Sequence, residues 1–261
     1  MFEKLYKVVQ EEFEKLPADI PQHYLPYPPK SLQDKFRWLL ACGKIFCPEY
    51  RFKSPHVDWW NDEEFCNYLS AMGEDWLMNS DRRWNMLQFM KFAHAVPGDT
   101  AECGAYRGSS SYLICKENKE AGSNRHHHIF DSFEGLSEPN EFDGGHWEKN
   151  ALQASEVELM ENLQEFVENI SVYKGWIPDH FHKVEDLKFS FVHIDVDLYA
   201  PTLQSIRFFY PRLNPGGVLV CDDYGVGTCP GCTKAINEFM ADKPESVISL
   251  STGACVLIKD T

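Results

Sequence analysis

The chain has 261 residues, a length that favours one large α/β domain with an added segment. Its formal net charge is −15, because 40 aspartates and glutamates outnumber 25 lysines and arginines. An acidic surface repels phosphate backbones and anionic lipids, so we expect no nucleic-acid partner and no membrane partner. No run of about 18 apolar residues predicts a transmembrane helix, and the nine scattered cysteines are typical of free thiols in the reducing cytoplasm, where we expect the protein to act.

The first part of the chain, residues 1–97, is rich in aromatic residues and in helical periodicity. An amphipathic stripe with spacings of three and four residues runs through Phe2, Leu5, Val9, Phe13 and Leu16. Further helices are predicted over residues 32–42, 63–72 and 83–95, before Pro97-Gly98-Asp99 breaks the pattern. We expect a helical extension that serves as a lid, a substrate-binding segment or a homo-oligomer interface.

The second part, residues 98–261, alternates short apolar runs with helical segments. Strands are predicted over residues 100–103, 128–131, 170–173, 189–195, 218–222, 247–250 and 254–258. One helix is predicted to begin at Ser155, with Glu158 completing a capping box, and to carry Leu159, Leu163, Phe166 and Ile170 on one face. A second follows Pro201 and is expected to stop at residues 214–217, Asn-Pro-Gly-Gly, and a third follows Pro230.

Strand–helix alternation of this kind predicts a mostly parallel sheet covered by helices on both faces. Only three residues, 251–253, separate the last two strands, so these form a hairpin and one of them is antiparallel. The fold class that we expect is therefore α/β, a Rossmann-like sheet that ends in an antiparallel C-terminal hairpin, with a helical N-terminal segment.

A glycine-containing turn follows the first predicted strand, in the order Glu-x-Gly-x-x-x-Gly. Glycines allow a tight turn and a close approach to a ligand. An acid stands where a dinucleotide fingerprint has its first glycine, and it suits a cation such as a sulfonium better than a phosphate. A plain strand–helix turn is the alternative. The residues predicted to contact this ligand are Glu102, Gly104, Tyr106, Gly108, Ser109 and Ser110.

Asp131 ends the second predicted strand, followed by Ser132 and Phe133. An acid at this point can accept hydrogen bonds from both ribose hydroxyls of an adenosine. We therefore expect these three residues to bind a nucleoside, unless Asp131 is simply an exposed loop acid. Gly175 and Trp176 follow the third strand and can flank the adenine, although a core tryptophan explains them equally well.

Four aspartates follow two strands that should be neighbours: Asp195 and Asp197 after one, Asp222 and Asp223 after the other. Ligands of open α/β sheets bind at the carboxyl ends of the strands, and unpaired carboxylates at this distance need a compensating cation. Oxygen ligands alone select Mg²⁺, Ca²⁺ or Mn²⁺ over Zn²⁺. The alternative is a set of helix-capping acids.

Six segments carry a resemblance to a known family, in this order over residues 99–241: ECGAYRGSS, FDSFEGL, VYKGWIPD, VHIDVDLYAPT, FFYPRLNPGGVLVCDDYG and CPGCTKAINEF. They are similar to the macrocin O-methyltransferase family of class I S-adenosylmethionine enzymes, whose members methylate sugar hydroxyls of antibiotics and similar natural products. The resemblance implies that Glu102, Gly104 and Asp131 contact S-adenosylmethionine, and we expect Asp195 to lie at the same site. It also implies that Asp195, Asp222 and Asp223 hold Mg²⁺.

The resemblance also implies a base. Asp197 matches the position proposed as general base in some members, and others are thought to use a histidine. Because Asp197 lies two residues after Asp195, an extended backbone would place both side chains on one side. His146, in the long segment 142–150 that can act as a lid, is the rival, with His193 and His180 as further candidates. We expect a small hydroxylated acceptor. A metal-dependent hydrolase and a non-catalytic binding module remain the alternatives.

Overall fold

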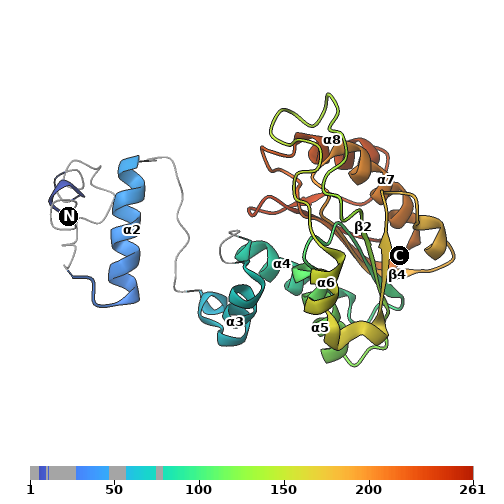
Figure 1. Ribbon diagram of the computed structural model, residues 1–261, viewed down its shortest axis with the longest axis horizontal. Helices are drawn as coiled ribbons and strands as arrows, with labels where there is room; N and C mark the ends of the chain where they lie inside the picture. The colour runs from blue at the N-terminus through green and yellow to red at the C-terminus, as the bar shows by residue number, and fades with distance from the viewer. Residues whose placement is uncertain (1–5, 10, 12–27, 47–56, 75–78, 261) are drawn as a thin grey trace. The chain divides into compact units, whose positions relative to one another are not determined.

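The computed structural model describes residues 6–9, 11, 28–46, 57–74 and 79–260, and the chain forms two compact units, Met1–Ser70 and Ala71–Thr261 (Figure 1). In the first unit, α2 spans Leu32–Phe46 and a 3-10 turn spans Asp58–Asn61, and α3 spans Glu63–Met72, two residues beyond the end of this unit. Val9 packs against Trp38 in a small apolar cluster. Of the predicted stripe at residues 2–16, residues 6–9 and 11 are helical and the others lie outside the described residues.

The second unit is built on a seven-stranded sheet in the order β3-β2-β1-β4-β5-β7-β6. The first five strands are parallel, and β7 is antiparallel to both β5 and β6. The strands span Asp99–Cys103 (β1), His127–Asp131 (β2), Ile170–Lys174 (β3), Phe189–Ile194 (β4), Leu213–Cys221 (β5), Ile248–Ser249 (β6) and Cys255–Ile258 (β7). This arrangement confirms the predicted fold class, including the antiparallel C-terminal hairpin.

Helices cover both faces of this sheet (Figure 1). On one face, α7 (Tyr199–Phe209) and α8 (Pro230–Met240) enclose the largest core cluster, which contains Cys103, Ile194 and Cys221. On the other face lie α4 (Ser80–Met90), α5 (Ser109–Glu120) and α6 (Glu156–Asn162), and the last two pack over Ile129. Burial of both faces explains why the central strands are near-continuous apolar runs.

The order of the strands determines where the candidate site lies. β1 is bordered by β2 on one side and by β4 on the other, so the order of the strands reverses at β1. In open α/β sheets a ligand crevice lies outside the carboxyl ends of the strands at such a reversal. The residues that follow β1, β4 and β5 therefore meet at one edge of the sheet.

Most predicted elements are confirmed, but several of their boundaries differ from the prediction. The helix over residues 83–95 begins earlier, at Ser80, and ends at Met90 in a 3-10 turn, Lys91–Ala93. The stretch Asn214–Gly217, predicted to be a helix stop, already belongs to β5, and α7 ends at Phe209. Gly216 donates its N–H to the carbonyl of Lys259, which draws this stretch into the sheet next to β7.

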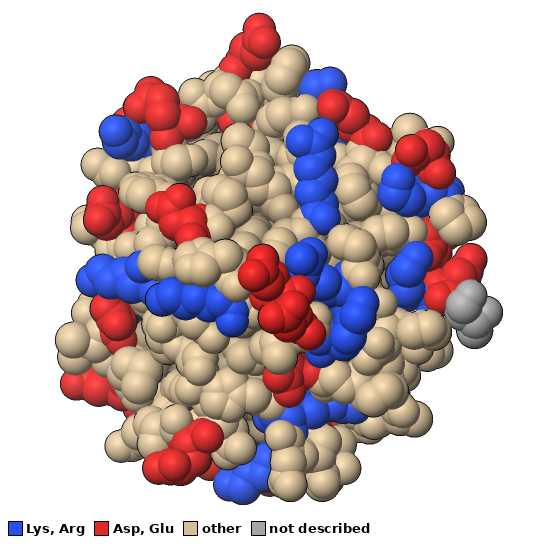
Figure 2. Space-filling view, turned by 90° about the vertical axis from the view of Figure 1, so that its right-hand side faces the viewer, with Lys and Arg blue, Asp and Glu red and all other residues tan. Residues whose placement is uncertain are grey.

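The predicted N-terminus at Ser155 is confirmed, because its side chain accepts the N–H of Val157 in α6. The helix itself is shorter than expected, and a 3-10 segment, Gln164–Asn169, connects it to β3. No helix among the described residues is long and apolar enough to cross a membrane. The face shown in Figure 2 carries basic and acidic side chains close together, so no single sign of charge dominates it.

Candidate active site

A cavity of about 450 Å³ opens at the carboxyl edge of the sheet. Its walls come from the turn after β1, the ends of β2, β4 and β5, the segment after β3, and α4 with the residues just before it. This is the volume of a small-molecule site. All its lining residues lie between Glu74 and Asp223, within the second unit.

The turn after β1 is shaped by glycine and by unusual backbone. A Cβ at Gly104, whose φ is +81°, would lie 1.8 Å from the carbonyl oxygen of Asp195, so only glycine permits the ends of β1 and β4 to approach this closely. Tyr106 has φ 50°, and Gly108, with φ 86°, precedes the first turn of α5. Gly104, Tyr106, Ser109 and Ser110 line the cavity, whereas Gly108 packs against Leu159 and does not.

Asp131 organises this turn. One carboxylate oxygen accepts the N–H groups of Ala105 at 2.8 Å and Tyr106 at 3.0 Å, and the other accepts the N–H of Phe133 at 2.7 Å. Asp131 and Ser132 line the cavity, and Phe133 is buried in the core away from it. Each carboxylate oxygen can accept more than one hydrogen bond, so Asp131 still has acceptor capacity toward a ligand.

Glu102 is not at the cavity surface. It lies within β1 between two residues that face α7 and α8, so its side chain points to the opposite face, where it contacts Ser111 of α5. It is fully buried, and its carboxylate accepts the Nδ1–H of His193 at 2.7 Å. Burial alone would raise the pKa of Glu102, but His127 and His193 outweigh it and hold the pKa below its usual range. The acid of this motif therefore supports the site from within.

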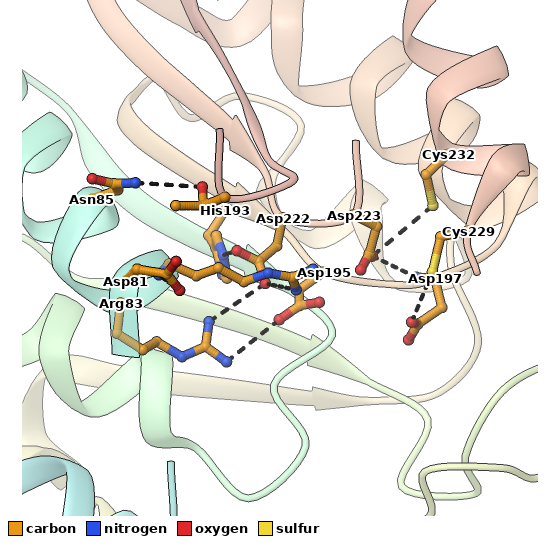
Figure 3. A network of polar contacts seen from close by, with 12 residues as sticks. Asp81, Arg83, Asn85, His193, Asp195, Asp197, Asp222, Asp223, Cys229 and Cys232 are labelled. Atoms are coloured by element: carbon orange, nitrogen blue, oxygen red, sulfur yellow. Dashed lines mark hydrogen bonds and ion pairs between the residues drawn. The ribbon is translucent and has the colours of Figure 1, made fainter. Parts of the chain in front are cut away.

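The four aspartates after β4 and β5 all line the cavity, as do Arg82 and Arg83, and Figure 3 shows Arg83 next to Asp195 and Asp222. Arg82 donates to Asp222 Oδ2 at 2.7 Å. Arg83 contacts Glu74 at 3.3 Å, Asp195 at 3.7 Å and Asp222 at 3.8 Å. Both arginines come from α4, and the sequence reasoning missed them. Two adjacent arginines in so acidic a chain are the signal that was available.

The carboxylates belong to two groups of side chains whose potential metal-ligand atoms lie within 4.8 Å of one another inside each group. One group is His193, Asp195 and Asp222, and the other is Asp197, Asp223 and Cys229. Burial and the charge of Asp222 raise the pKa of Asp195 to about 6. Burial and the charge of Asp195 raise the pKa of Asp197 to about 7. In Asp222, burial is outweighed by His193 and the arginines, which lower its pKa. Carboxylates this close together repel one another, so an added positive charge stabilises their ionised forms.

Asp197 is not in extended backbone, so the argument from strand geometry was wrong. The strand β4 ends at Ile194, and Asp197 has φ 58°. Its N–H donates to Asp223 Oδ2 at 2.9 Å, and its carboxylate accepts a hydrogen bond from the Cys229 thiol at 3.4 Å. In this left-handed conformation the side chain reaches Cys229, the residue just before α8. Strained backbone of this kind is common at functional sites.

The segment between β2 and α6 is fixed over the cavity. Asp143 is buried, and its carboxylate accepts the N–H of Tyr199 at 2.6 Å, at the start of α7. Trp147 lines the cavity and donates its indole N–H to Cys229 Sγ at 3.3 Å. His146 is exposed, packs edge-on against Trp147, and does not line the cavity.

Of the remaining predicted residues, Gly175 and Trp176 line the cavity. His180 binds the carbonyl of Lys174 at 2.8 Å, and neither His180 nor His193 lines the cavity. Besides the arginines, the sequence reasoning did not single out Glu74, Asn79, Leu136, Ile177, Leu198 and Gln204, which also line it.

Comparison with known proteins agrees with this geometry. The model of the macrocin O-methyltransferase family (TylF) matches residues 52–248, about three-quarters of the chain. The demethyldecarbamoylnovobiocin O-methyltransferase of Streptomyces niveus is 28% identical over an alignment of 220 residues that covers 74% of this chain and 79% of the relative. The mycinamicin III 3''-O-methyltransferase of Micromonospora griseorubida is 30% identical over an alignment of 160 residues that covers 55% of this chain and 61% of the relative.

Two solved structures extend the comparison to the fold. The O-methyltransferase NovP superposes with a TM-score of 0.59 at 25% identity, over 69% of this chain and 80% of that protein. CalS11, a calicheamicin methyltransferase, superposes with a TM-score of 0.64 over 88% of this chain and 93% of its own, and at 17% identity it supports the fold alone. The chain therefore belongs to the macrocin O-methyltransferase family, and it is an S-adenosylmethionine-dependent O-methyltransferase with the class I fold.

Proposed function

We propose that this enzyme methylates a sugar or polyol hydroxyl of a small natural product and that it requires a divalent ion, Mg²⁺ in the first instance. The observation that carries the proposal is the convergence of four carboxylates on the cavity that the turn after β1 also lines. The relatives named above methylate compounds of the novobiocin and mycinamicin classes. The cavity of about 450 Å³ accommodates a methyl donor together with part of such an acceptor.

The residues present fit a divalent ion. Asp195, Asp222 and Asp223 offer hard oxygen donors at neighbouring strand ends, and each is buried or nearly so. We propose that these three hold the ion. When bound there, such an ion acts as a Lewis acid that lowers the pKa of an acceptor hydroxyl. Arg82 and Arg83 neutralise part of the same acidic charge in this structure.

We propose that the donor lies along the edge formed by Gly104, Tyr106, Ser109, Ser110, Asp131, Ser132 and Trp176. Methyl transfer from a sulfonium to an oxygen is an in-line displacement, so the enzyme gains most by aligning the hydroxyl with the methyl group. Glu102 supports this edge indirectly, because it connects β1 to Ser111 of α5 and to His193 of β4.

The hydroxyl proton must leave during the transfer, and we propose Asp197 as its acceptor. Asp197 lines the cavity beside the proposed metal ligands, so its carboxylate lies where it can accept the proton of a bound acceptor hydroxyl. His146, the rival from the sequence, is exposed and would need the loop to rearrange. A homo-oligomeric state and a cytoplasmic location stay predictions.

Titration calorimetry with S-adenosylhomocysteine, followed by turnover assays on polyhydroxylated acceptors with and without EDTA, tests the proposal. We expect saturable binding of S-adenosylhomocysteine, loss of turnover in EDTA, and recovery with Mg²⁺ or Mn²⁺. Full turnover in thoroughly chelated enzyme would exclude the metal. Turnover restricted to acceptors without a sugar or polyol would exclude the proposed substrate class.

A further inference from the structure

One acid of the cavity wall has no part in the proposed function. Glu74 lies in the turn that follows α3, is 2% exposed, and lines the cavity. The other acids that line it, among the described residues, are Asp131 and the four aspartates after β4 and β5. Because all of those have a proposed role, Glu74 is the acid whose presence in the wall still needs an explanation.

Glu74 is joined to the turn after β1 and to α4. One oxygen of its carboxylate accepts a hydrogen bond from the hydroxyl of Ser109, the first residue of α5. The other oxygen accepts the Nε–H of Arg83 at 3.3 Å. Ser109 and Arg83 line the cavity as well. The negative charge of Glu74 therefore lies beside the edge along which we propose that the donor binds.

Arg83 connects Glu74 to the opposite wall. Its terminal nitrogens lie 3.7 Å from a carboxylate oxygen of Asp195 and 3.8 Å from one of Asp222. These distances are those of ion pairs and are too long for hydrogen bonds. Figure 3 shows the guanidinium of Arg83 beside the two aspartates. The wall thus holds a negative and a positive group side by side, between the turn after β1 and the ends of β4 and β5.

The position of this pair relative to the sheet is informative. Asp131 ends β2 and Trp176 follows β3, and these residues are proposed to bind the nucleoside end of the donor. The acids that Arg83 contacts follow β4 and β5, which lie on the other side of β1. A donor that crosses the turn after β1 would therefore bring its second end, an amino acid, to Glu74 and Arg83.

The amino-acid end of S-adenosylmethionine carries an ammonium group and a carboxylate. Glu102, the acid of the motif after β1, is fully buried and does not line the cavity, so it is not placed to bind the ammonium. We propose that Glu74 binds the ammonium group of the donor and that Arg83 binds its carboxylate. Such a ligand adds no net charge to the buried pair, and each of its charged groups gains a charge-assisted hydrogen bond.

The inference rests on the proposed course of the donor along the turn after β1. It goes beyond that course by assigning the residues that distinguish an amino acid from a plain nucleoside. Ser109 contributes indirectly, because its hydrogen bond holds the Glu74 carboxylate in place before the ligand arrives. Preorganisation of this kind lowers the cost of binding.

Titration calorimetry of the full-length protein tests the two contacts separately. The ligands are S-adenosylhomocysteine, its deaminated analogue and its decarboxylated analogue. We expect Glu74→Gln to weaken S-adenosylhomocysteine at least tenfold, the usual contribution of a charged hydrogen bond. The deaminated analogue has no ammonium group to lose, so its affinity should change by no more than about threefold. Arg83→Gln should weaken S-adenosylhomocysteine by a similar factor and spare the decarboxylated analogue in the same way.

Two further variants complete the comparison. Glu117, on α5, contacts His94 and does not line the cavity. Glu117→Gln therefore removes a neighbouring acid without touching the site, and all three affinities should stay at the wild-type value. Asp131→Ala should weaken all three ligands by a similar factor, because they share the nucleoside end.

The inference and the proposed donor site fail in different ways. If Glu74→Gln weakens all three ligands equally, or none of them, Glu74 does not bind the ammonium group, and the proposed course of the donor survives as long as Asp131→Ala weakens them all. If Asp131→Ala changes none of the affinities, the proposed donor edge is wrong and this inference falls with it. Should Glu74→Gln not fold, as judged by circular dichroism, Glu74→Asp keeps the charge and withdraws it by one methylene. That variant must then weaken S-adenosylhomocysteine more than the deaminated analogue, and equal weakening would overturn the inference.

Discussion

Asp131 holds three backbone N–H groups in this structure and faces the cavity with its remaining acceptor capacity. A hydrogen bond to a charged group contributes about 1.5–3 kcal/mol, so we predict that Asp131→Ala weakens S-adenosylhomocysteine binding tenfold or more. Calorimetry measures the change, and Glu134→Ala, an exposed acid three residues further on, is the control for charge alone. An Asp131→Ala variant with wild-type affinity would remove Asp131 from the donor site.

The role of Asp197 can be tested with a substitution that preserves the backbone conformation. Asparagine tolerates left-handed backbone, so Asp197→Asn should keep the φ of 58° and the fold. We predict a loss in turnover of about 10²–10⁴, the usual contribution of a general base, with unchanged binding of S-adenosylhomocysteine. Single-turnover rates measure this, with His146→Ala as the comparison. A near wild-type rate for Asp197→Asn and a large loss for His146→Ala would assign the proton to the loop histidine.

At the scale of single residues, the sequence located the acids at strand ends but not all their roles. Asp131, Asp195, Asp222 and Asp223 were predictable because an acid directly after a buried strand has few structural uses. The burial of Glu102 follows from the alternation of side chains along β1, which the motif obscured. Arg82 and Arg83 reach the site through the packing of α4 against the sheet, so the pair of arginines in the sequence marks them as unusual but does not reveal that contact.

The C-terminal hairpin is fastened by a buried cluster near β7. Glu245 accepts hydrogen bonds from Tyr210 and from Lys259, and Lys259 lies 3.1 Å from the Tyr210 hydroxyl. Although burial would raise the pKa of Glu245, these partners outweigh it and lower the pKa from 4.5 to about 2. Because the folded pKa lies below the unfolded one, this stabilisation is complete above pH 4.5 and is lost as the pH falls toward 2.

We therefore predict that Glu245→Gln lowers the free energy of unfolding at pH 7 by up to about 3 kcal/mol. The difference from wild type should shrink as the pH falls from about 4.5 toward 2. Denaturant titrations at several pH values measure it, with the exposed Asp242→Asn as the control. A difference that does not change with pH would mean that packing, and not the charge of Glu245, fastens the hairpin.

At the scale of elements, the sequence predicted the strands well because short apolar runs between turn residues leave few alternatives. The end of α7 was wrong for a tertiary reason. Asn214 to Gly217 has the composition of a loop, but pairing with Lys259 adds it to β5. A partner 43 residues away along the chain is invisible to a local reading. The same holds for α6, where the apolar spacing continued past Asn162 although the helix did not.

At the scale of the whole molecule, the compact unit that holds the sheet extends beyond the domain that composition predicted, and the domain boundary itself stays a prediction. The sequence suggested a domain over residues 98–261, whereas the compact unit begins at Ala71 and includes α4. The position of the boundary affects the candidate site, because a domain that starts at residue 98 would lack Arg82 and Arg83. The buried Asp222 would then lose the guanidinium at 2.7 Å that neutralises it.

Two truncated chains test which boundary describes the folding unit. A chain of residues 71–261 keeps every residue that lines the cavity, so we predict cooperative unfolding and binding of S-adenosylhomocysteine within about threefold of the full-length protein. A chain of residues 98–261 loses α4 and leaves a buried carboxylate without its partner, a change that typically costs about 3–5 kcal/mol. It should unfold at a clearly lower temperature and bind the ligand more weakly. Calorimetry and thermal unfolding measure both, and a third chain that starts at Glu63 keeps α3 whole as a control for cutting that helix. Equal stability and affinity of the chains that start at residues 71 and 98 would return the boundary to the position predicted from composition and leave the arginines of α4 without a part in the site.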